Sequence, residues 1–250
     1  MSAAKKFADN DAKSADKIRE DLHRQILSTV SHDLKTPLAT IIGSLEVYQK
    51  MYDKLSPEKR QLLLHASLAE AYRLDNFITN ILDMTRLEAG VVRASAEVCD
   101  IQQIIKDTIT RLGPKGLAAT VEISISPRAG DLITDPMLLG RALGLVVENS
   151  LRHGGGGKAP IIEITSSHNG HAHSIHVRDH GPGIPENRLE DIFAKYTRFN
   201  NADYQNAGTG LGLSIARELM TTIDGKITAQ NHAAGGALFM LQFPQLNLKQ

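Results

Sequence analysis

The chain has 250 residues, and its 28 basic and 28 acidic side chains give a formal net charge of zero. This balance excludes a nucleic-acid-binding protein that works through bulk positive charge, and the absence of Trp argues against an aromatic platform for stacked bases. The single cysteine, Cys99, excludes an intramolecular disulfide framework and a zinc site with several cysteines. No apolar run approaches the ~18 residues of a membrane span, and the N-terminus lacks the apolar core of a secretory signal, so we expect a cytoplasmic protein.

The first part of the chain predicts helices. Residues 1–20 are rich in Ala, Lys and Asp and are interpreted as an N-terminal linker or signalling helix. Over residues 22–48, apolar side chains recur at three- to four-residue steps, which predicts a long helix with one apolar face. Ser56 and Pro57 are typical of a helix N-cap and first turn, and predict a second helix to about Leu87.

A heptad-like seam runs along the second helix in steps of four and three. Its members are Leu64, Ser67, Ala71, Leu74, Ile78, Ile81 and Thr85. Gly90 follows as the expected stop. Because one helical hairpin cannot cover its own apolar stripe, we expect a second copy of the chain to complete a four-helix bundle. Packing of the hairpin on the chain's own C-terminal part is the alternative.

The C-terminal part mixes both patterns. Alternation of apolar and polar residues predicts strands, and apolar steps of three and four predict helices. Helices are expected at 101–112, 136–152 and 210–223, and strands at 120–126, 161–166, 174–178, 225–231 and 237–243. The expected fold class is α+β, with an antiparallel helical hairpin at residues 21–92 followed by an α/β sandwich at residues 97–250.

The first motif whose residues could take part in a reaction is SHDLKTPL, at residues 31–38. An imidazole is a competent nucleophile toward phosphorus when one ring nitrogen is free and an acceptor holds the other. Asp33 beside His32 can fix the tautomer and stabilise the cation formed on attack. Pro37 lies within the helical pattern and predicts a kink close to His32. Taken alone, the motif also fits a surface histidine followed by a helix breaker.

Three further motifs lie in the expected sandwich. Asn149 lies three residues before Arg152 on one helix face, where an amide can ligate Mg²⁺ and a guanidinium can meet phosphate. Asp179 ends a strand in phase with apolar residues, so its carboxylate can accept from the exocyclic amine of a base. GTGLGL at residues 208–213 opens a helix and favours an anion site, and the polar stretch 200–206 is expected to form a lid. Each motif alone also fits an ordinary helix face or turn.

Taken in order, these motifs resemble those of the two-component sensor histidine kinases. SHDLKTPL resembles the family's phosphoacceptor box, residues 148–153 its N box, DHGPGI at 179–184 its first glycine box, IFAKYTRF at 192–199 its F box, and GTGLGL its second glycine box. The resemblance covers residues 22–244. It implies a dimerisation and histidine phosphotransfer hairpin, followed by an ATP-binding domain of the gyrase, heat-shock-chaperone and histidine-kinase type. It also implies a homodimer, ATP with Mg²⁺, and a response regulator receiver domain as partner.

In the hairpin, the resemblance implies that His32 is autophosphorylated from ATP and that Asp33 orients or activates it. Thr36 matches a position that the family uses in dephosphorylating the partner regulator. The phosphoryl group is then passed to an Asp of the response regulator. The input is expected from an upstream sensor protein, or from a sensor domain of a longer chain.

In the sandwich, the resemblance implies that Asn149 ligates Mg²⁺, with Glu148 as a second candidate, and that Asp179 recognises the adenine amino group. The other residues implied to bind nucleotide are Arg152, Gly181, Gly183, Lys195, Arg198, Gly208, Gly210, Leu211 and Gly212. Phe193 matches the F box. Leu145 departs from the family pattern, which has Asn at this position, and a leucine cannot ligate a metal.

Several alternatives stay open. An ATP hydrolase of the same nucleotide fold would use Glu148 to activate water. A non-catalytic or phosphatase-biased scaffold would bind a regulator, with its chemistry weakened by Leu145. His171 and His173 have the spacing of a metal-binding pair, although an outward-facing polar hairpin is the preferred interpretation. Cys99 is expected to be a buried bystander.

Overall fold

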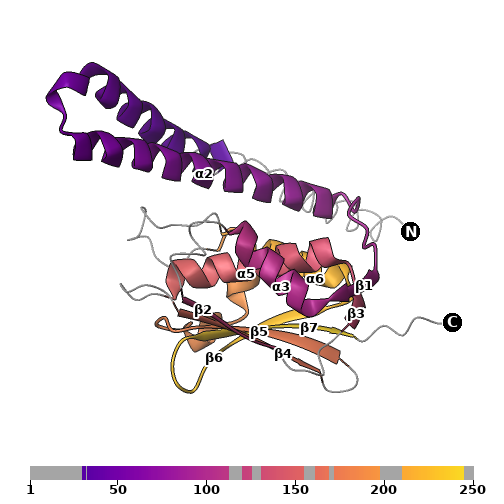
Figure 1. The fold of residues 1–250 in the computed structure, drawn as a ribbon. Coiled ribbons are helices and arrows are strands. Elements are labelled where there is room, and N and C mark those ends of the chain that lie inside the picture. The colour runs from indigo at the N-terminus through magenta and orange to yellow at the C-terminus, as the bar shows by residue number, and fades with distance from the viewer. Residues whose placement is uncertain are drawn as a thin grey trace, which may run out of the picture. The chain divides into compact units, whose positions relative to one another are not determined.

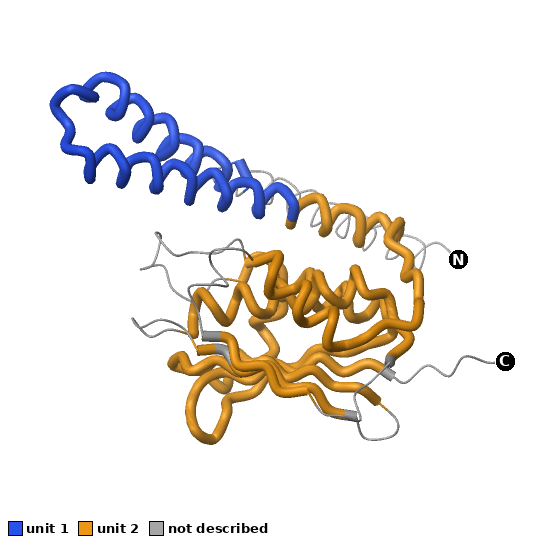
Figure 2. The backbone as a smooth tube through the Cα atoms, viewed as in Figure 1, with its two compact units in different colours: residues 1–79 blue, residues 80–250 orange. Residues whose placement is uncertain are grey.

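The computed structural model describes residues 30–31, 33–112, 120–125, 131–154, 161–168, 172–197 and 210–244. The chain divides into two compact units, residues 1–79 and residues 80–250 (Figure 2). The helix α2 (Pro57–Glu88) begins in the first unit and ends in the second. Within the described ranges, no helix combines the length and apolar content that a membrane crossing requires.

The first unit is built from two helices. Residues 33–50 are helical, and the 3₁₀ turn η1 (Tyr52–Lys54) connects them to α2. The predicted start of α2 is confirmed, because Ser56 Oγ accepts a hydrogen bond from the Lys59 amide at 3.4 Å and Pro57 opens the helix. The kink predicted at Pro37 stays a prediction.

The predicted stop at Gly90 is also confirmed. Gly90 has a φ of +64°, a conformation that favours glycine. Its amide donates to the carbonyl of Leu87, and the Val91 amide donates to the carbonyl of Arg86. These two bonds are the pattern by which a left-handed residue ends a helix and satisfies its last carbonyls.

Some residues of the predicted heptad-like seam of α2 are buried, and others are exposed. Ser67 is buried, whereas Leu64 and Ile78 are 39% and 45% exposed. Other large apolar side chains of the first unit are exposed as well: Leu38, Ile42, Leu45, Leu62, Leu68 and Tyr72. A single chain therefore leaves much of the apolar surface of its helices uncovered.

The second unit is an α/β sandwich (Figure 1). Its five-stranded sheet has the order β2-β4-β5-β7-β6. The strands are β2 (Thr120–Ile125), β4 (Ile161–His168), β5 (Ala172–Asp179), β6 (Lys226–Asn231) and β7 (Ala237–Pro244). β2 runs parallel to β4, and the other neighbours are antiparallel. The helices α3 (Ile101–Arg111), α5 (Pro136–His153) and α6 (Gly212–Thr222) lie on one face of the sheet, which confirms the expected architecture.

A second, two-stranded sheet is not predicted by the sequence analysis. β1 (Glu97–Asp100) pairs antiparallel with β3 (Asp131–Thr134). The pair leads into the capped start of α5, where Asp135 Oδ1 accepts from two amides of the first turn and Oδ2 accepts from the Ser95 amide at 2.9 Å. The domain boundary that we expect between residues 90 and 97 stays a prediction.

The core lies between the helices and the sheet. Its largest fully buried side chains include Ile105, Leu143, Ile175, Ile215, Phe239 and Leu241. Met84, near the end of α2, is 4% exposed and belongs to the same core. Cys99 is half-buried, and its Sγ lies at hydrogen-bonding distance, 3.5 Å, from the carbonyl of Leu132. Among the described residues, no group of three or more His, Cys, Asp or Glu is placed to hold a metal ion.

Candidate functional site

The predicted site residues fall into separate parts of the structure. Asp33 and Thr36 belong to the first unit, and the boxes implied to bind nucleotide belong to the second. His32, Arg198 and Gly208 lie outside the described residues, as do the polar stretch 200–206 and His171.

Asp33 and Thr36 lie near the start of the first helix. Asp33 is half-buried and Thr36 is exposed, one turn apart on the same continuous helix. The Thr36 carbonyl accepts a hydrogen bond from the Thr40 hydroxyl at 3.1 Å. Asp33 and Thr36 follow position 32 by one and four residues in the sequence.

Asp179 is held at the end of β5 by backbone groups. The residue is 3% exposed, and its Oδ1 accepts hydrogen bonds from the amides of Gly181 at 3.0 Å and Ala237 at 2.9 Å. These two bonds fix the orientation of the carboxyl group. Oδ2 has no hydrogen-bond partner among the described residues. Oδ2 is not among the fully buried atoms, so it is accessible to a hydrogen-bond donor of a ligand.

Glycines allow three segments to converge on Asp179. A Cβ on Gly236 would lie 1.8 Å from the Asp179 carbonyl oxygen, and one on Gly154 would lie 2.7 Å from Asp179 Cβ. A Cβ on Gly181 would lie 2.5 Å from the His153 carbonyl oxygen. The end of α5, the turn after β5 and the start of β7 can therefore meet only because no side chain intervenes.

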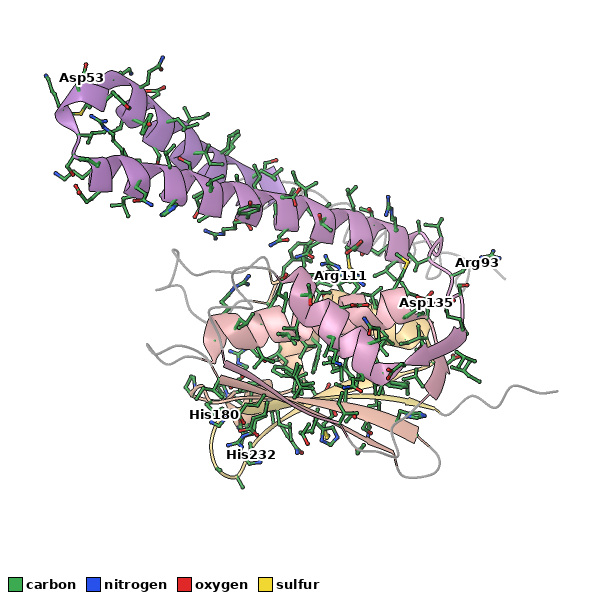
Figure 3. The ribbon with its side chains drawn as sticks, in the orientation of Figure 1. Asp53, Arg93, Arg111, Asp135, His180 and His232 are labelled. Atoms are coloured by element: carbon green, nitrogen blue, oxygen red, sulfur yellow. The ribbon has the colours of Figure 1, made fainter. Side chains whose placement is uncertain are left out.

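The turn after β5 is held by the end of β6. Asn231 Oδ1 accepts from the Ile184 amide at 2.8 Å, and Asn231 Nδ2 donates to the Ile184 carbonyl at 2.7 Å. Gly183, with a φ of +78°, passes so close that its Cβ would lie 2.8 Å from Asn231 Oδ1. Figure 3 shows His180 and His232 at the end of the sheet opposite Asp135, the N-cap of α5.

A small ion cluster lies next to Asp179. Glu163 Oε1 is 3.1 Å from Nη1 of Arg178 and 2.7 Å from Nε2 of His180. Burial by itself raises the pKa of Glu163, but His180 and Arg178 outweigh it and hold that pKa below its ordinary value of 4.5. The cluster ties β4 to β5 where the first glycine box begins.

One face of α5 turns toward the start of α6. Leu145 is 3% exposed, and its Cδ2 would lie 3.7 Å from a Cβ on Gly212. One turn further along, Glu148 and Asn149 are half-buried, and neither side chain has a hydrogen-bond partner among the described residues. Arg152 is exposed. A carboxylate and an amide oxygen fit Mg²⁺, which completes its shell with phosphate and water oxygens.

The second glycine box opens α6. Leu211 stands at the N-cap position and makes no side-chain cap hydrogen bond, and the N-terminus of a helix favours an anion. Gly210 has a φ of +68°, and a Cβ there would lie 2.9 Å from the Thr197 carbonyl oxygen. The Tyr196 amide donates to the Gly210 carbonyl at 2.9 Å. The end of the F box therefore lies against the start of the second glycine box.

The F box also contacts α6 and α2. Phe193 is 4% exposed, and the Arg217 guanidinium lies 4.4 Å from its ring centroid. Lys195 Nζ lies 2.6 Å from Oε1 of Glu88, which is 107 residues away in the sequence. The sequence analysis does not predict this contact. Burial, and then the negative charge of Glu88, raise the pKa of the Tyr196 phenol above its ordinary value of 10.0.

Comparisons with known proteins match two family models to the chain. A family model described as the His Kinase A (phospho-acceptor) domain matches residues 22–90. A second model, described as the histidine kinase-, DNA gyrase B- and HSP90-like ATPase, matches residues 134–247.

Individual relatives point the same way. The chain is 30% identical over 230 residues to the sensor protein KdpD of Escherichia coli, which covers 91% of this chain and 25% of that protein. It is 30% identical over 241 residues to the signal transduction histidine-protein kinase AfsQ2 of Streptomyces coelicolor, covering 91% and 43%. The chain thus spans less than half the length of these relatives. The solved complex of histidine kinase ThkA with response regulator protein TrrA shares the fold, with a TM-score of 0.65 and 21% identity over 96% of this chain and 67% of that one.

Proposed function

Because the chain belongs to the two-component sensor histidine kinases, with a phospho-acceptor domain followed by an ATPase domain, we propose that it is an ATP-dependent protein-histidine autokinase. The observation that carries the proposal is the buried carboxyl group of Asp179, oriented by two backbone amides through one oxygen and unpartnered at the other. In this proposal Oδ2 of Asp179 accepts from the adenine amino group, and Gly181 and Gly183 let the backbone approach the base.

The phosphates of ATP then lie at the start of α6. The first-turn amides lack a side-chain cap and receive the phosphate oxygens, with Gly210, Leu211 and Gly212 shaping the turn. Arg152 and Lys195 supply positive charge from α5 and the F box, and we assign Arg198 and Gly208 to the same site from their motifs. Asn149 and Glu148 would hold Mg²⁺, which would neutralise the negative charge that develops on the phosphate oxygens.

The proposed transfer step uses residues of both units. A ring nitrogen of His32 attacks the γ-phosphorus, a phosphorus–nitrogen bond forms, and the bond to the β–γ bridging oxygen breaks, so that ADP leaves. Asp33 accepts a hydrogen bond from the other ring nitrogen and stabilises the cationic ring. An Asp of a response regulator then takes the phosphoryl group. Thr36 serves a separate reaction, in which it places a water molecule that hydrolyses the phosphoryl group from the regulator.

The proposal includes a homodimer formed through the hairpin. Leu64 and Ile78 belong to a heptad-like seam but are 39% and 45% exposed in one chain. Exposed apolar side chains at helical spacing are covered when a second hairpin completes a four-helix bundle. The response regulator is proposed to dock on the same hairpin, near His32.

The test is incubation with γ-labelled ATP and Mg²⁺, comparing the wild type with His32→Ala and Asp179→Asn. We expect acid-labile, base-stable label on the wild type and none on either variant. His32→Ala should still bind ATP in a calorimetric titration, whereas Asp179→Asn should bind it weakly, because the acceptor is replaced. Label that persists in His32→Ala would contradict the assignment of the phosphorylated residue.

The two alternatives give different results in the same assay. Phosphate release without phosphohistidine would identify an ATP hydrolase, in which Glu148 activates water. Nucleotide binding with neither label nor phosphate release would identify a regulator-binding scaffold.

A further inference from the structure

Glu88 and Lys195 form a contact that the proposed phosphotransfer reaction does not use. Lys195 Nζ lies 2.6 Å from Glu88 Oε1, and the two side chains are 39% and 56% exposed. Within the described part of the chain, Glu88 is the sole hydrogen-bond partner of the Lys195 ammonium. The pair joins the last turn of α2 to the F box.

The end of α2 that carries Glu88 is anchored to the second unit. Met84 is buried in the core of that unit. Arg141 of α5 donates to Asp83 Oδ2 at 2.9 Å and to Asn80 Oδ1 at 2.8 Å. Because these contacts fix this end of the helix, Glu88 stays in place when the flexible Lys195 side chain changes partner.

Lys195 lies beside the proposed phosphate site. The next residue, Tyr196, donates its amide to the Gly210 carbonyl at 2.9 Å, two residues before α6 begins. Tyr196 and Gly210 both have positive φ values, +62° and +68°, a backbone conformation that is uncommon for a residue other than glycine such as Tyr196. A long cationic side chain beside these two residues has two anions within its range, the Glu88 carboxylate and the phosphates of a bound nucleotide.

We propose that Glu88 and the phosphates of the nucleotide compete for Lys195. Glu88 holds the ammonium in the nucleotide-free protein, and a bound nucleoside triphosphate takes it. The inference rests on the proposed function, since it needs a nucleotide at the second glycine box. A triphosphate carries several negative charges, so it attracts the ammonium more strongly than one exposed carboxylate does.

Competition makes Glu88 a link between nucleotide binding and α2. Nucleotide binding releases the last turn of α2 from the F box. By reciprocity, whatever keeps Glu88 on Lys195 weakens nucleotide binding by the same factor. The Glu88 carboxylate at the end of α2 is thereby paired with Lys195 only while the ATP site is empty.

The experiment measures the affinity for two probes, a non-hydrolysable Mg·ATP analogue and adenosine, by calorimetric titration. The proteins are the wild type, Glu88→Gln, Lys195→Met and the double variant. Glu88→Gln should bind the ATP analogue about two- to fivefold more tightly, the range expected for removing an exposed ion pair. Its affinity for adenosine should not change, because adenosine has no phosphates. In the Lys195→Met background, Glu88→Gln should have no effect.

Glu70→Gln is the matched control. Glu70 lies on the same helix and pairs with Arg73 at 3.5 Å, three residues away, so this change removes a surface pair that lies outside the second unit. It should leave both affinities at their wild-type values.

Three outcomes would overturn the proposal. If Glu88→Gln weakens or does not change binding of the ATP analogue, Glu88 does not compete with phosphates. If the adenosine affinity changes in parallel, Glu88 acts on the shape of the site. If the tightening persists in the Lys195→Met background, it comes from the lost negative charge alone. Failure of the proposed function has a separate signature, because the wild type would then bind neither probe.

Discussion

The substitution Gly236→Ala tests the convergence of segments on Asp179. Gly236 has a φ of +86°, and a Cβ would lie 1.8 Å from the carbonyl oxygen and 2.7 Å from the carbonyl carbon of Asp179. Its neighbour Gly235 has a φ of +91°, but nothing lies within 4 Å of its Cβ position. Gly235→Ala therefore introduces a similar backbone strain without the collision.

The two substitutions should differ in magnitude. A left-handed conformation costs an ordinary residue about 1–2 kcal/mol, so Gly235→Ala should lower the free energy of unfolding by that amount. Gly236→Ala should add about 1–3 kcal/mol, because overpacking forces the backbone apart. The displacement would also move the Ala237 amide, which donates to Asp179 Oδ1. Nucleotide affinity should therefore fall in Gly236→Ala and stay near the wild-type value in Gly235→Ala.

Urea denaturation followed by far-UV circular dichroism measures the stability of both variants, and titration with a non-hydrolysable ATP analogue measures their affinity. Equal stability of the two variants would refute the claim that the Asp179 backbone excludes a side chain at Gly236. Wild-type affinity in a destabilised Gly236→Ala protein would refute the claim that this contact orients the carboxyl group.

Two further predictions concern caps and pH. Asp135→Ala should lower the free energy of unfolding by about 2 kcal/mol, and Asp100→Ala should lower it by about 1 kcal/mol. The difference is expected because Asp135 is 8% exposed and accepts hydrogen bonds from three amides, whereas Asp100 is exposed and accepts from one. Equal losses in urea denaturation would contradict this ranking. Burial lowers the pKa of His176 from its ordinary value of 6.5, so the folded state favours the neutral ring. The contribution of His176 to the free energy of unfolding is complete above about pH 6.5 and is lost as the pH falls through the lowered pKa. In urea denaturation over a pH series, the free energy of unfolding should therefore fall less steeply with decreasing pH in His176→Asn than in the wild type.

The elements that could be predicted from sequence are those whose ends are set locally. Ser56 and Pro57 open α2, Gly90 ends it, and Asp135 caps α5, all through contacts within a few residues. The small sheet of β1 and β3 escaped prediction for the opposite reason. Each strand has four residues, too few for a clear alternation, and the partners lie more than 30 residues apart, as Cys99 and Leu132 illustrate.

The same distinction applies to the candidate site. Burial of Asp179 was predictable, because the period of a strand places it on the same side as Ile175 and Val177. What fixes its carboxyl group was not, since the Ala237 amide lies 58 residues away. The contact of Lys195 with Glu88 was hidden similarly, because neither residue is unusual in its own segment.

Leu145 shows what a departure from a family motif can mean physically. The resemblance implies Asn at this position, and a leucine cannot ligate a metal. In the structure Leu145 is 3% exposed and lies against Gly212, the first residue of α6. Burying a leucine side chain contributes about 1.5–3 kcal/mol, so its role there is to hold α5 against the start of α6. The spacing between the metal-binding face of α5 and the phosphate-binding end of α6 is thereby preserved. Any weakening of metal binding would then come from a smaller set of oxygen ligands, Glu148 and Asn149, and not from displaced helices.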